Sequence, residues 1–409
     1  MGCRERAPRT TRDGRYGQPI GWGAMDTRTN LPVVGMVGAG QLARMTHQAA
    51  IALGQSLRIL AANADDGAAL VASDVLVGSH TDLAALRELA AGSDVVTFDH
   101  EHVPGEHIRA LLADGYQVHP GPDALICAQD KQVMRERLGK LGVPCPRWAP
   151  VAGPDDLVAF AGGSWPVVLK AARGGYDGKG VWVVGSAEQA GELVAELRAA
   201  GAPLIVEERV ALRRELAAVV ARSPFGQVAA YPVVETVQAD GICVEVIAPA
   251  PELPEQRAVD AQQLAIRIAN ELGVVGVLAV ELFETEQGEL VVNELAMRPH
   301  NSAHWTIEGA RTSQFEQHLR AVLDYPLGAT GLTAPWVVMA NVLGGEPGGM
   351  GIDERLHHLM AELPDAKVHL YGKQVRPGRK IGHVTVLGDD LDEVRARATR
   401  GAAWLRDGR

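Results

Sequence analysis

The chain has 409 residues, of which 47% are hydrophobic and 22% are charged, and its formal net charge is −11. This length exceeds what one hydrophobic core supports, so we expect about two to four domains of an ordinary globular protein. The negative charge argues against general nucleic-acid binding, and no apolar run approaches the roughly 18 residues of a membrane span.

The first residues and the cysteines bear on the cellular setting. Residues 1–30 are expected to form a disordered tail, because the first 24 are rich in Arg and Gly and lack the apolar segment of a secretory signal. Met25 is an alternative start of translation. The four cysteines lie far apart without a C-x-x-C pair, which favours a reduced, cytoplasmic setting without disulfides or a zinc site.

Short apolar runs alternate with amphipathic segments from Val33 to about residue 130. The pattern predicts strands within 33–40, 56–63 and 94–99 and before the turn at 119–122, and helices within 41–54, 82–91 and 103–115. Alternation of this kind indicates a doubly wound parallel sheet. We therefore expect a Rossmann-like domain over residues 31–130.

The turn Gly38-Ala39-Gly40 joins the first predicted strand to the first helix and has the shape of a dinucleotide fingerprint. Glycines at such a turn let backbone N–H groups approach a phosphate at a helix N-terminus. The acidic residue expected after the second strand is only approximated by Asp65 and Asp66. A plain tight turn, a site for a phosphate or another anion, and an NAD site all remain open.

Residues 131–207 form the next predicted unit. A helix from Lys131 is stopped by Gly142 and Pro144, and strands at 165–172 and 180–184 precede a helix at 187–201 and a strand at 204–210. The loop between the first two strands has four glycines in the seven residues 174–180. This pattern favours a flap whose amides and Lys179 close over phosphates, although it is not a Walker A loop, and a plain hairpin loop is the alternative.

Lys170 lies in the strand just before this loop. It either reaches a phosphate of a bound nucleotide or is an ordinary charge on an edge strand.

A hairpin is predicted over residues 277–296, after strands within 215–249 and a helix from about Pro254 to Leu272. If Gln287 and Gly288 form a two-residue turn, Glu281 faces Glu294 at roughly 5 Å. Two facing carboxylates repel each other unless a cation binds between them. Mg²⁺ prefers such oxygen ligands, and Asn293 could add a neutral one. The alternative is a register slip that leaves one Glu in solvent.

Two polar clusters follow the hairpin. Arg298, His300 and Asn301 come directly after it. In the last segment, which has predicted strands within 336–344, 367–372 and 381–388 and a final helix at 391–405, cations surround the turn Pro377-Gly378. These are Lys373, Arg376, Arg379 and Lys380, with His383. The bend suits a small phosphorylated ligand, and a solvated basic loop is the alternative. A nucleic-acid patch is disfavoured, because aromatic residues are not interleaved.

Together these segments resemble the ATP-grasp ligases and, more specifically, the 5-(carboxyamino)imidazole ribonucleotide synthase family. The resemblance runs from about Val33 to Gly388 and rests on GAGQLARM, TFDHEHVP, GGYDGKG, ELGVVGVLAVELF, VNELAMRPHNSAHWTIEGARTSQFEQHLRA and YGKQVRPGRKIGHV. It implies an α/β ATP-grasp fold: a Rossmann-like preATP-grasp domain, a small ATP-grasp subdomain over 131–207, a large one over 208–331 and a small β-rich C-terminal subdomain over 332–409.

The resemblance also implies an activity. It is the carboxylation of 5-aminoimidazole ribonucleotide with ATP and bicarbonate, through carboxyphosphate, in purine biosynthesis. ATP and Mg²⁺ (or Mn²⁺) would be required, the protein would be a homodimer without nucleic-acid or membrane partners, and a mutase would take up the product. Alternatives are another ATP-grasp ligase, such as a formate-dependent glycinamide ribonucleotide transformylase, a nicotinamide-dependent reductase, and a non-catalytic nucleotide-sensing module.

Site residues follow from the resemblance, position by position. ATP would be bound by Lys131, Lys170, Gly175, Tyr176, Asp177, Gly178, Lys179, Gly180, Val181, Glu207, Glu208, Arg209, Val210, Glu215, Gln238, Asn293 and Glu294. The metal would be held by Glu281 and Glu294. The reacting groups would be surrounded by Tyr176, Asp177, Gly178, Lys179, Arg298, His300 and Asn301. The 5′-phosphate of the substrate would be bound by Gly40, Gln41, Lys373, Arg379 and Lys380.

The chain departs from the family pattern at four positions. Lys131 and Lys179 stand where Arg is usual, which keeps the charge but loses bidentate geometry. Gln238 stands where many members have His. Asp99 replaces a more usual Glu, which puts the substrate contact there in doubt.

Overall fold

The computed structural model describes residues 25–175, 179–199, 201–346 and 348–408. The predicted flap residues Tyr176, Asp177 and Gly178 lie outside these ranges, as do residues 1–24 of the predicted tail. Residues 25–30, which we assigned to the same tail, form a turn whose Asp26 carboxylate accepts a hydrogen bond of 2.9 Å from Ser56 Oγ. No helix in the described ranges is long and apolar enough to cross a membrane.

The N-terminal sheet is parallel and has the strand order β3-β2-β1-β4, which confirms the predicted doubly wound arrangement. Apolar residues on the two faces of β1 pack against different helices: Met36 contacts the core beside α1 and α10, and Val37 the core beside α2 and α3. The bounds are β1 Val33–Val37, α1 Gln41–Ala52, β2 Ser56–Ala61, β3 Asp74–Val77, α2 Leu83–Ala91, β4 Val95–Phe98, α3 Gly105–Ala113 and α4 Pro122–Gln129.

Three elements of this region differ from the prediction, and one of them is helix α4, which was not predicted. The expected strand before Pro120 is only an isolated bridge between Val96 and Val118. Strand β3 was not predicted, because it is a short edge strand whose side chains alternate little in burial; Val77, for example, is 63% exposed.

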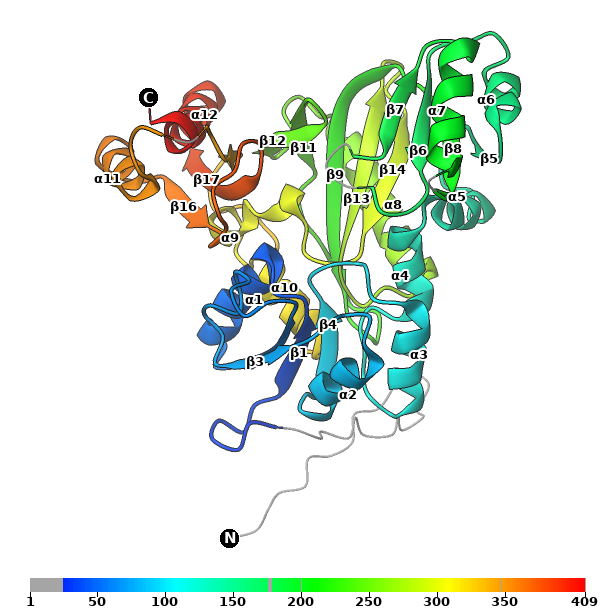
Figure 1. Ribbon diagram of the computed structural model, residues 1–409. Helices are drawn as coiled ribbons and strands as arrows, with labels where there is room; N and C mark the ends of the chain where they lie inside the picture. The colour runs from blue at the N-terminus through cyan, green and yellow to red at the C-terminus, as the bar shows by residue number, and fades with distance from the viewer. Residues whose placement is uncertain (1–24, 176–178, 200, 347, 409) are drawn as a thin grey trace.

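A small antiparallel sheet with the order β5-β8-β6-β7 carries α6 and α7 on one face (Figure 1). Lys170 lies on β6, an interior strand, and is 5% exposed, so its interpretation as an edge-strand charge is wrong. The sequence did not predict β5 or α6. The bounds are α5 Lys131–Lys140, β5 Trp148–Val151, α6 Pro154–Ala161, β6 Val167–Ala171, β7 Val181–Val184, α7 Ala187–Ala199 and β8 Leu204–Glu208.

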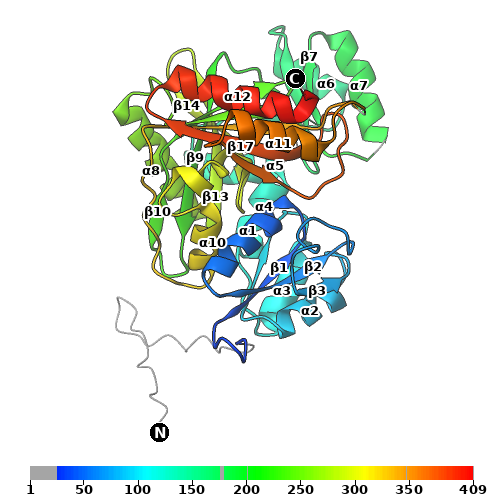
Figure 2. The same ribbon diagram turned by 90° about the vertical axis from the view of Figure 1, so that its left-hand side faces the viewer.

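The large antiparallel sheet has the order β14-β13-β9-β11-β12-β15-β17-β16, with β10 paired to β9. Because β15 pairs with β12, the C-terminal strands continue the sheet of the preceding region, and α11 and α12 cover that end (Figure 2). The strands are β9 Leu212–Arg222, β10 Val228–Ala230, β11 Val234–Ala239, β12 Ile242–Ala248, β13 Gly276–Thr285, β14 Leu290–Ala296, β15 Trp336–Leu343, β16 Lys367–Leu370 and β17 Lys380–Gly388.

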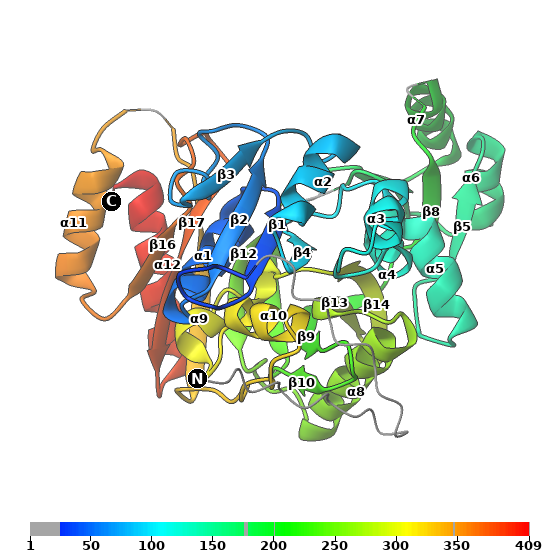
Figure 3. The ribbon, with the colours of Figure 1, turned by 90° about the horizontal axis from the view of Figure 1, so that it is seen from below.

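The helices of this part are α8 Glu255–Glu271, η1 Asn301–Ala303, α9 Thr306–Gly309, α10 Gln314–Val322, α11 Ile352–Glu362 and α12 Leu391–Asp407. The sequence predicted α8 and α12 but not α9, α10 or α11. Helix α10 lies beside α1 and covers one face of the N-terminal sheet through Leu319 and Val322 (Figure 3).

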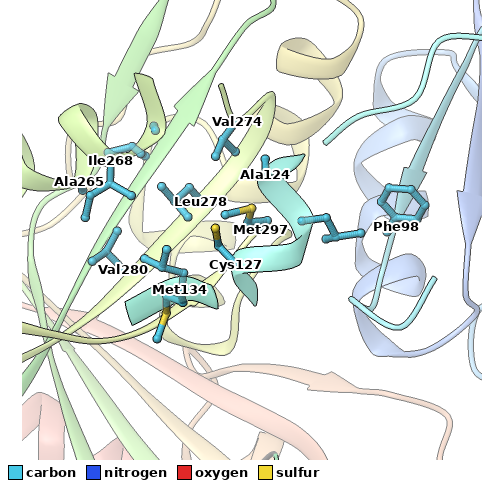
Figure 4. Close-up of a cluster of buried hydrophobic side chains, with 14 of the residues drawn as sticks. Phe98, Ala124, Cys127, Met134, Ala265, Ile268, Val274, Leu278, Val280 and Met297 are labelled. Atoms are coloured by element: carbon cyan, nitrogen blue, oxygen red, sulfur yellow. The ribbon is translucent and has the colours of Figure 1, made fainter. Parts of the chain in front are cut away.

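One hydrophobic core connects the N-terminal sheet to the large sheet. It runs from Phe98 on β4 through Cys127 on α4 and Met134 on α5 to Leu278 on β13 and Ile268 on α8 (Figure 4). The first three predicted domains therefore share this core, whereas the small sheet and the C-terminal helices also have cores of their own. This shared core fixes α4 and α5 against the β13–β14 hairpin.

Candidate active site

A cleft of about 2720 Å³ lies where the three sheets meet. Apart from Gly180, all the predicted site residues that the structure describes line this cleft. They are Gly40, Gln41, Lys131, Lys170, Gly175, Lys179, Val181, Glu207, Glu208, Arg209, Val210, Glu215, Gln238, Glu281, Asn293, Glu294, Arg298, His300, Asn301, Lys373, Arg379 and Lys380. Segments up to 340 positions apart thus contribute to one cavity.

The β13–β14 hairpin places Glu281 directly opposite Glu294, as predicted, but the predicted turn is wrong. The strands separate at Thr285, whose N–H donates to the carbonyl of Glu289, so the loop is longer than two residues. Leu282 then pairs with Val292, a register that by itself would set Glu281 opposite Asn293. A β-bulge at Asn293 adds one residue to β14 and brings Glu294 back into line.

Both carboxylates have cationic or hydrogen-bonding neighbours. Lys131 Nζ lies 2.8 Å from Glu294 Oε1, and His300 Nε2 lies 3.1 Å from Glu281 Oε1. Since His300 Nδ1 accepts a bond from the Ser302 N–H, the ring proton is on Nε2 and points at Glu281. Burial alone would raise the pKa of Glu281, but the hydrogen bond from His300 and the nearby lysines hold the pKa of Glu281 below its usual value.

Glu215 on β9 adds a third carboxylate to this part of the cleft. Burial and the charge of Glu281 raise the pKa of Glu215 to about 7, and a hydrogen bond with Gln238 acts in the opposite direction. Burial is the larger cause of this shift, and the charge of Glu281 adds to it because the two carboxylates lie near each other.

Lys170 belongs to a buried ion-pair network that the sequence did not predict. Its Nζ lies 2.8 Å from Glu207 Oε2 and 3.1 Å from Asn293 Oδ1. The other oxygen of Glu207 accepts a bond of 2.7 Å from Arg135 Nε. Both carboxylate oxygens of Glu207, expected beside the adenine, are therefore engaged by cations. A signal for Arg135 was present, since it lies one helical turn after Lys131.

The Asp99 carboxylate, directly after β4, lies against the Gly38–Gly40 turn, where an anion was expected. Asp99 Oδ2 accepts a bond of 2.6 Å from the Gly40 N–H at the start of α1. Gly38 has φ +101°, and a Cβ there would collide with the Asp99 carboxylate. Burial raises the pKa of Asp99 to about 6, against the effect of the Gly40 hydrogen bond. The Gly40 N–H is thus already taken by Asp99, which argues against the NAD interpretation and equally against a contact from this N–H to a phosphate or another anion.

The basic bend is held against the N-terminal sheet. Lys373 Nζ donates to Gln41 Oε1 and lies 5.5 Å above the ring of Tyr371. Tyr371 itself is buried, and its hydroxyl lies 2.8 Å from Nδ1 of His383 on β17. The His383 ring contacts that of His304, just after η1, with ring centroids 5.2 Å apart and planes inclined by 31°. These ring contacts connect the bend to the loop that carries His300.

Two further groups face the cleft near this loop. Arg298 Nη2 lies 3.2 Å from Glu101 Oε2, and Glu101 Oε1 also accepts the Met297 N–H. Glu101 belongs to the TFDHEHVP motif, but no role was predicted for it. Both side-chain polar atoms of Asn301 are buried without a protein partner. An unpartnered amide beside a cleft indicates a position where a bound molecule supplies the hydrogen bonds.

The residues present fit a divalent cation. Among the described residues, no group of three or more His, Cys, Asp or Glu side chains is placed to hold a metal ion. The facing Glu281 and Glu294 with the Asn293 amide form the smaller oxygen set that Mg²⁺ uses when substrate phosphates complete its coordination. These residues would hold it together with a nucleoside triphosphate.

Comparisons with known proteins agree with this architecture. Three family models match successive parts of the chain: a ribonucleotide synthetase preATP-grasp domain over residues 31–129, an ATP-grasp domain over 136–315 and a phosphoribosylaminoimidazole carboxylase C-terminal domain over 337–397. The fold and the cleft thus define an ATP-grasp protein.

Individual relatives show which family of ATP-grasp proteins the chain resembles. The N5-carboxyaminoimidazole ribonucleotide synthase of Mycobacterium tuberculosis is 63% identical over 380 residues, covering 92% of this chain and 89% of that protein. The crystal structure of an ADP complex of purK, described as N5-carboxyaminoimidazole ribonucleotide synthetase, has a TM-score of 0.84 at 35% identity and covers 92% of this chain and 98% of its own.

The Aspergillus clavatus synthase in complex with ADP and 5-aminoimidazole ribonucleotide has a TM-score of 0.81 at 31% identity, covering 94% of this chain and 99% of its own. The chain belongs to the N5-carboxyaminoimidazole ribonucleotide synthase family, which confirms the resemblance found in the sequence.

Proposed function

We propose that this protein is an ATP-dependent carbon–nitrogen ligase that carboxylates 5-aminoimidazole ribonucleotide with bicarbonate and releases ADP and phosphate. Family membership supports this activity, and so does one structural observation in particular. The cleft that holds Lys131, Lys170 and the facing Glu281 and Glu294 also contains the basic bend with Lys373. A triphosphate and a phosphorylated second substrate would therefore bind to one cavity.

ATP would bind between the small and large sheets. Lys170, on β6 directly before the flap, and Lys131, at the N-terminus of α5, would contact its phosphates. Glu208 and Val210, between β8 and β9, would line the adenine pocket, and Glu215 on β9 would contact the ribose. When bound, Mg²⁺ would neutralise charge on the phosphoryl group, the main requirement of phosphoryl transfer.

The first step would join bicarbonate to the terminal phosphoryl group. A bicarbonate oxygen attacks the γ-phosphorus, ADP leaves, and carboxyphosphate forms. Arg298, His300 and Asn301 lie on the loop after β14 and would orient bicarbonate. The unpartnered Asn301 amide supports this placement. The flap, including Lys179, would exclude the water that destroys acyl phosphates.

The second step would form the new carbon–nitrogen bond. The exocyclic amine attacks the carbonyl carbon of carboxyphosphate, or CO₂ released from it, and inorganic phosphate leaves. Lys373, Arg379 and Lys380, with Gln41, would bind the 5′-phosphate of the nucleotide through charge-assisted hydrogen bonds. Holding both reactants in one closed cavity supplies the effective concentration that free bicarbonate lacks.

The rate of ADP release, measured with a coupled enzyme assay, tests the proposal. Release should require bicarbonate and 5-aminoimidazole ribonucleotide together, and omission of either should return the rate to background. ADP release with formate and glycinamide ribonucleotide instead would favour the other ATP-grasp ligase. NADH binding without a metal requirement would favour the nicotinamide-dependent reductase. Nucleotide binding without ADP release would favour the non-catalytic nucleotide-sensing module.

The finer features stay predictions from the resemblance. They are the Mg²⁺ requirement, with Mn²⁺ as a substitute, the homodimer, the cytoplasmic location and the mutase that would take up the product. The consequences of Lys131, Lys179, Gln238 and Asp99 for affinity are predictions too.

A further inference from the structure

We propose that Arg135 is a positioning residue, which holds the β-bulge at Asn293 and thereby keeps Glu294 opposite Glu281. Its guanidinium is fully buried and makes three hydrogen bonds. Nη1 donates to the Val292 carbonyl at 3.0 Å, Nη2 to the Asn293 carbonyl at 2.8 Å, and Nε to Glu207 at 2.7 Å.

The two carbonyl contacts depend on the bulge. In a regular strand, successive carbonyl groups point to opposite sides, so one side chain does not reach both. Because Arg135 donates to both carbonyls, those of Val292 and Asn293 lie on the same side of β14 at the bulge, where the extra residue has no ladder partner. A buried carbonyl without a partner costs about 1–3 kcal/mol, and Arg135 removes this cost. A planar group with several N–H donors in fixed positions suits the task.

Arg135 also connects the bulge to the lysines of the site. It lies one turn after Lys131 on α5, so both side chains project from the same face of the helix, and Lys131 pairs with Glu294. Through Glu207 it fixes Lys170. Removing Arg135 would therefore loosen the register of the carboxylate pair while leaving the basic bend intact.

This inference rests on the proposed function. Its test is the affinity of the full-length protein, with ADP present, for Mn²⁺, measured from the electron paramagnetic resonance signal of the free Mn²⁺. Arg135→Met should weaken Mn²⁺ binding at least about tenfold, and Arg135→Lys, which keeps the charge and one carbonyl contact, about threefold. The KM for 5-aminoimidazole ribonucleotide should change less than about twofold in both variants.

Arg214→Met is the matched control. Like Arg135, Arg214 binds a buried carboxylate and a backbone carbonyl. Its partners are Glu284 on β13 and the carbonyl of Pro251, and Arg214 does not line the cleft. It should lower stability towards urea and leave Mn²⁺ binding unchanged.

The inference would be overturned if Arg135→Met bound Mn²⁺ as tightly as the wild-type protein. It would also be overturned if Arg214→Met lost as much Mn²⁺ affinity as Arg135→Met. If Arg135→Met does not fold, unchanged affinity in Arg135→Lys overturns it. Failure of the proposed function is distinguishable, because then the wild-type protein itself would release no ADP.

Discussion

Lys131 at the start of α5 and Glu294 on β14 form an ion pair of 2.8 Å, although 163 positions separate them in the chain. The pair places a cation and a carboxylate where the phosphates of ATP are expected. The core shared by α4, α5 and the hairpin fixes this distance. The shared core already holds α5 against the hairpin, so loss of either charge should affect chemistry more than folding.

Glu294→Gln should lower the rate of ADP release by about a thousandfold or more, because the amide removes a charge that holds the metal and balances Lys131. Glu289→Gln is the control, since Glu289 is exposed on the same hairpin and outside the cleft lining. Steady-state rates at saturating substrates measure the effect. A Glu294→Gln protein with a tenth of the native rate would contradict the assignment.

Lys373→Met should raise the KM for 5-aminoimidazole ribonucleotide about 10- to 100-fold and leave the KM for ATP unchanged. The reason is the loss of a charge-assisted bond to the 5′-phosphate, worth about 1.5–3 kcal/mol. Lys367→Met removes an exposed cation from the neighbouring strand β16 and should change neither KM. Equal increases in both KM values would place Lys373 outside the nucleotide site.

Tyr371→Phe should lower the free energy of unfolding by about 1–3 kcal/mol, because the buried Nδ1 of His383 loses its partner. It should also raise the KM for 5-aminoimidazole ribonucleotide, since Tyr371 supports the bend two residues before Lys373. Tyr231→Phe removes a similar buried bond, from the Tyr231 hydroxyl to the Thr312 carbonyl, far from the bend. Urea unfolding should show similar losses for both variants, with the KM effect in Tyr371→Phe alone.

Asp99 should make stability depend on pH. Burial raises the pKa of Asp99 to about 6 in the folded protein, above its unfolded value, so the folded state binds the proton more tightly. The stabilisation is complete below about pH 4 and is lost as the pH rises through 6. Relative to Asp99→Asn, the native protein should lose about 2 kcal/mol of unfolding free energy between pH 4 and 7. Parallel urea-unfolding profiles for the two proteins would contradict this.

The sequence by itself determined the features that depend on near neighbours in the chain. Alternating apolar runs indicated the parallel sheet. Gly142 ended α5 as predicted, with φ +63°. The hairpin placed two carboxylates on facing strands, and Pro377-Gly378 gathered the cations of the bend. Each of these signals is local, because helix and strand periodicity and turn chemistry act within about a dozen residues.

Only the tertiary structure decided how these pieces make one site. The turn of the hairpin is longer than predicted, and the register is restored by a bulge whose carbonyls bind Arg135, 158 positions away from Asn293. The Gly40 N–H is taken by Asp99, 59 positions away. The physical reason is the same in both cases. A buried polar group must find a partner, and the partner is supplied by whichever distant segment the folded core brings alongside.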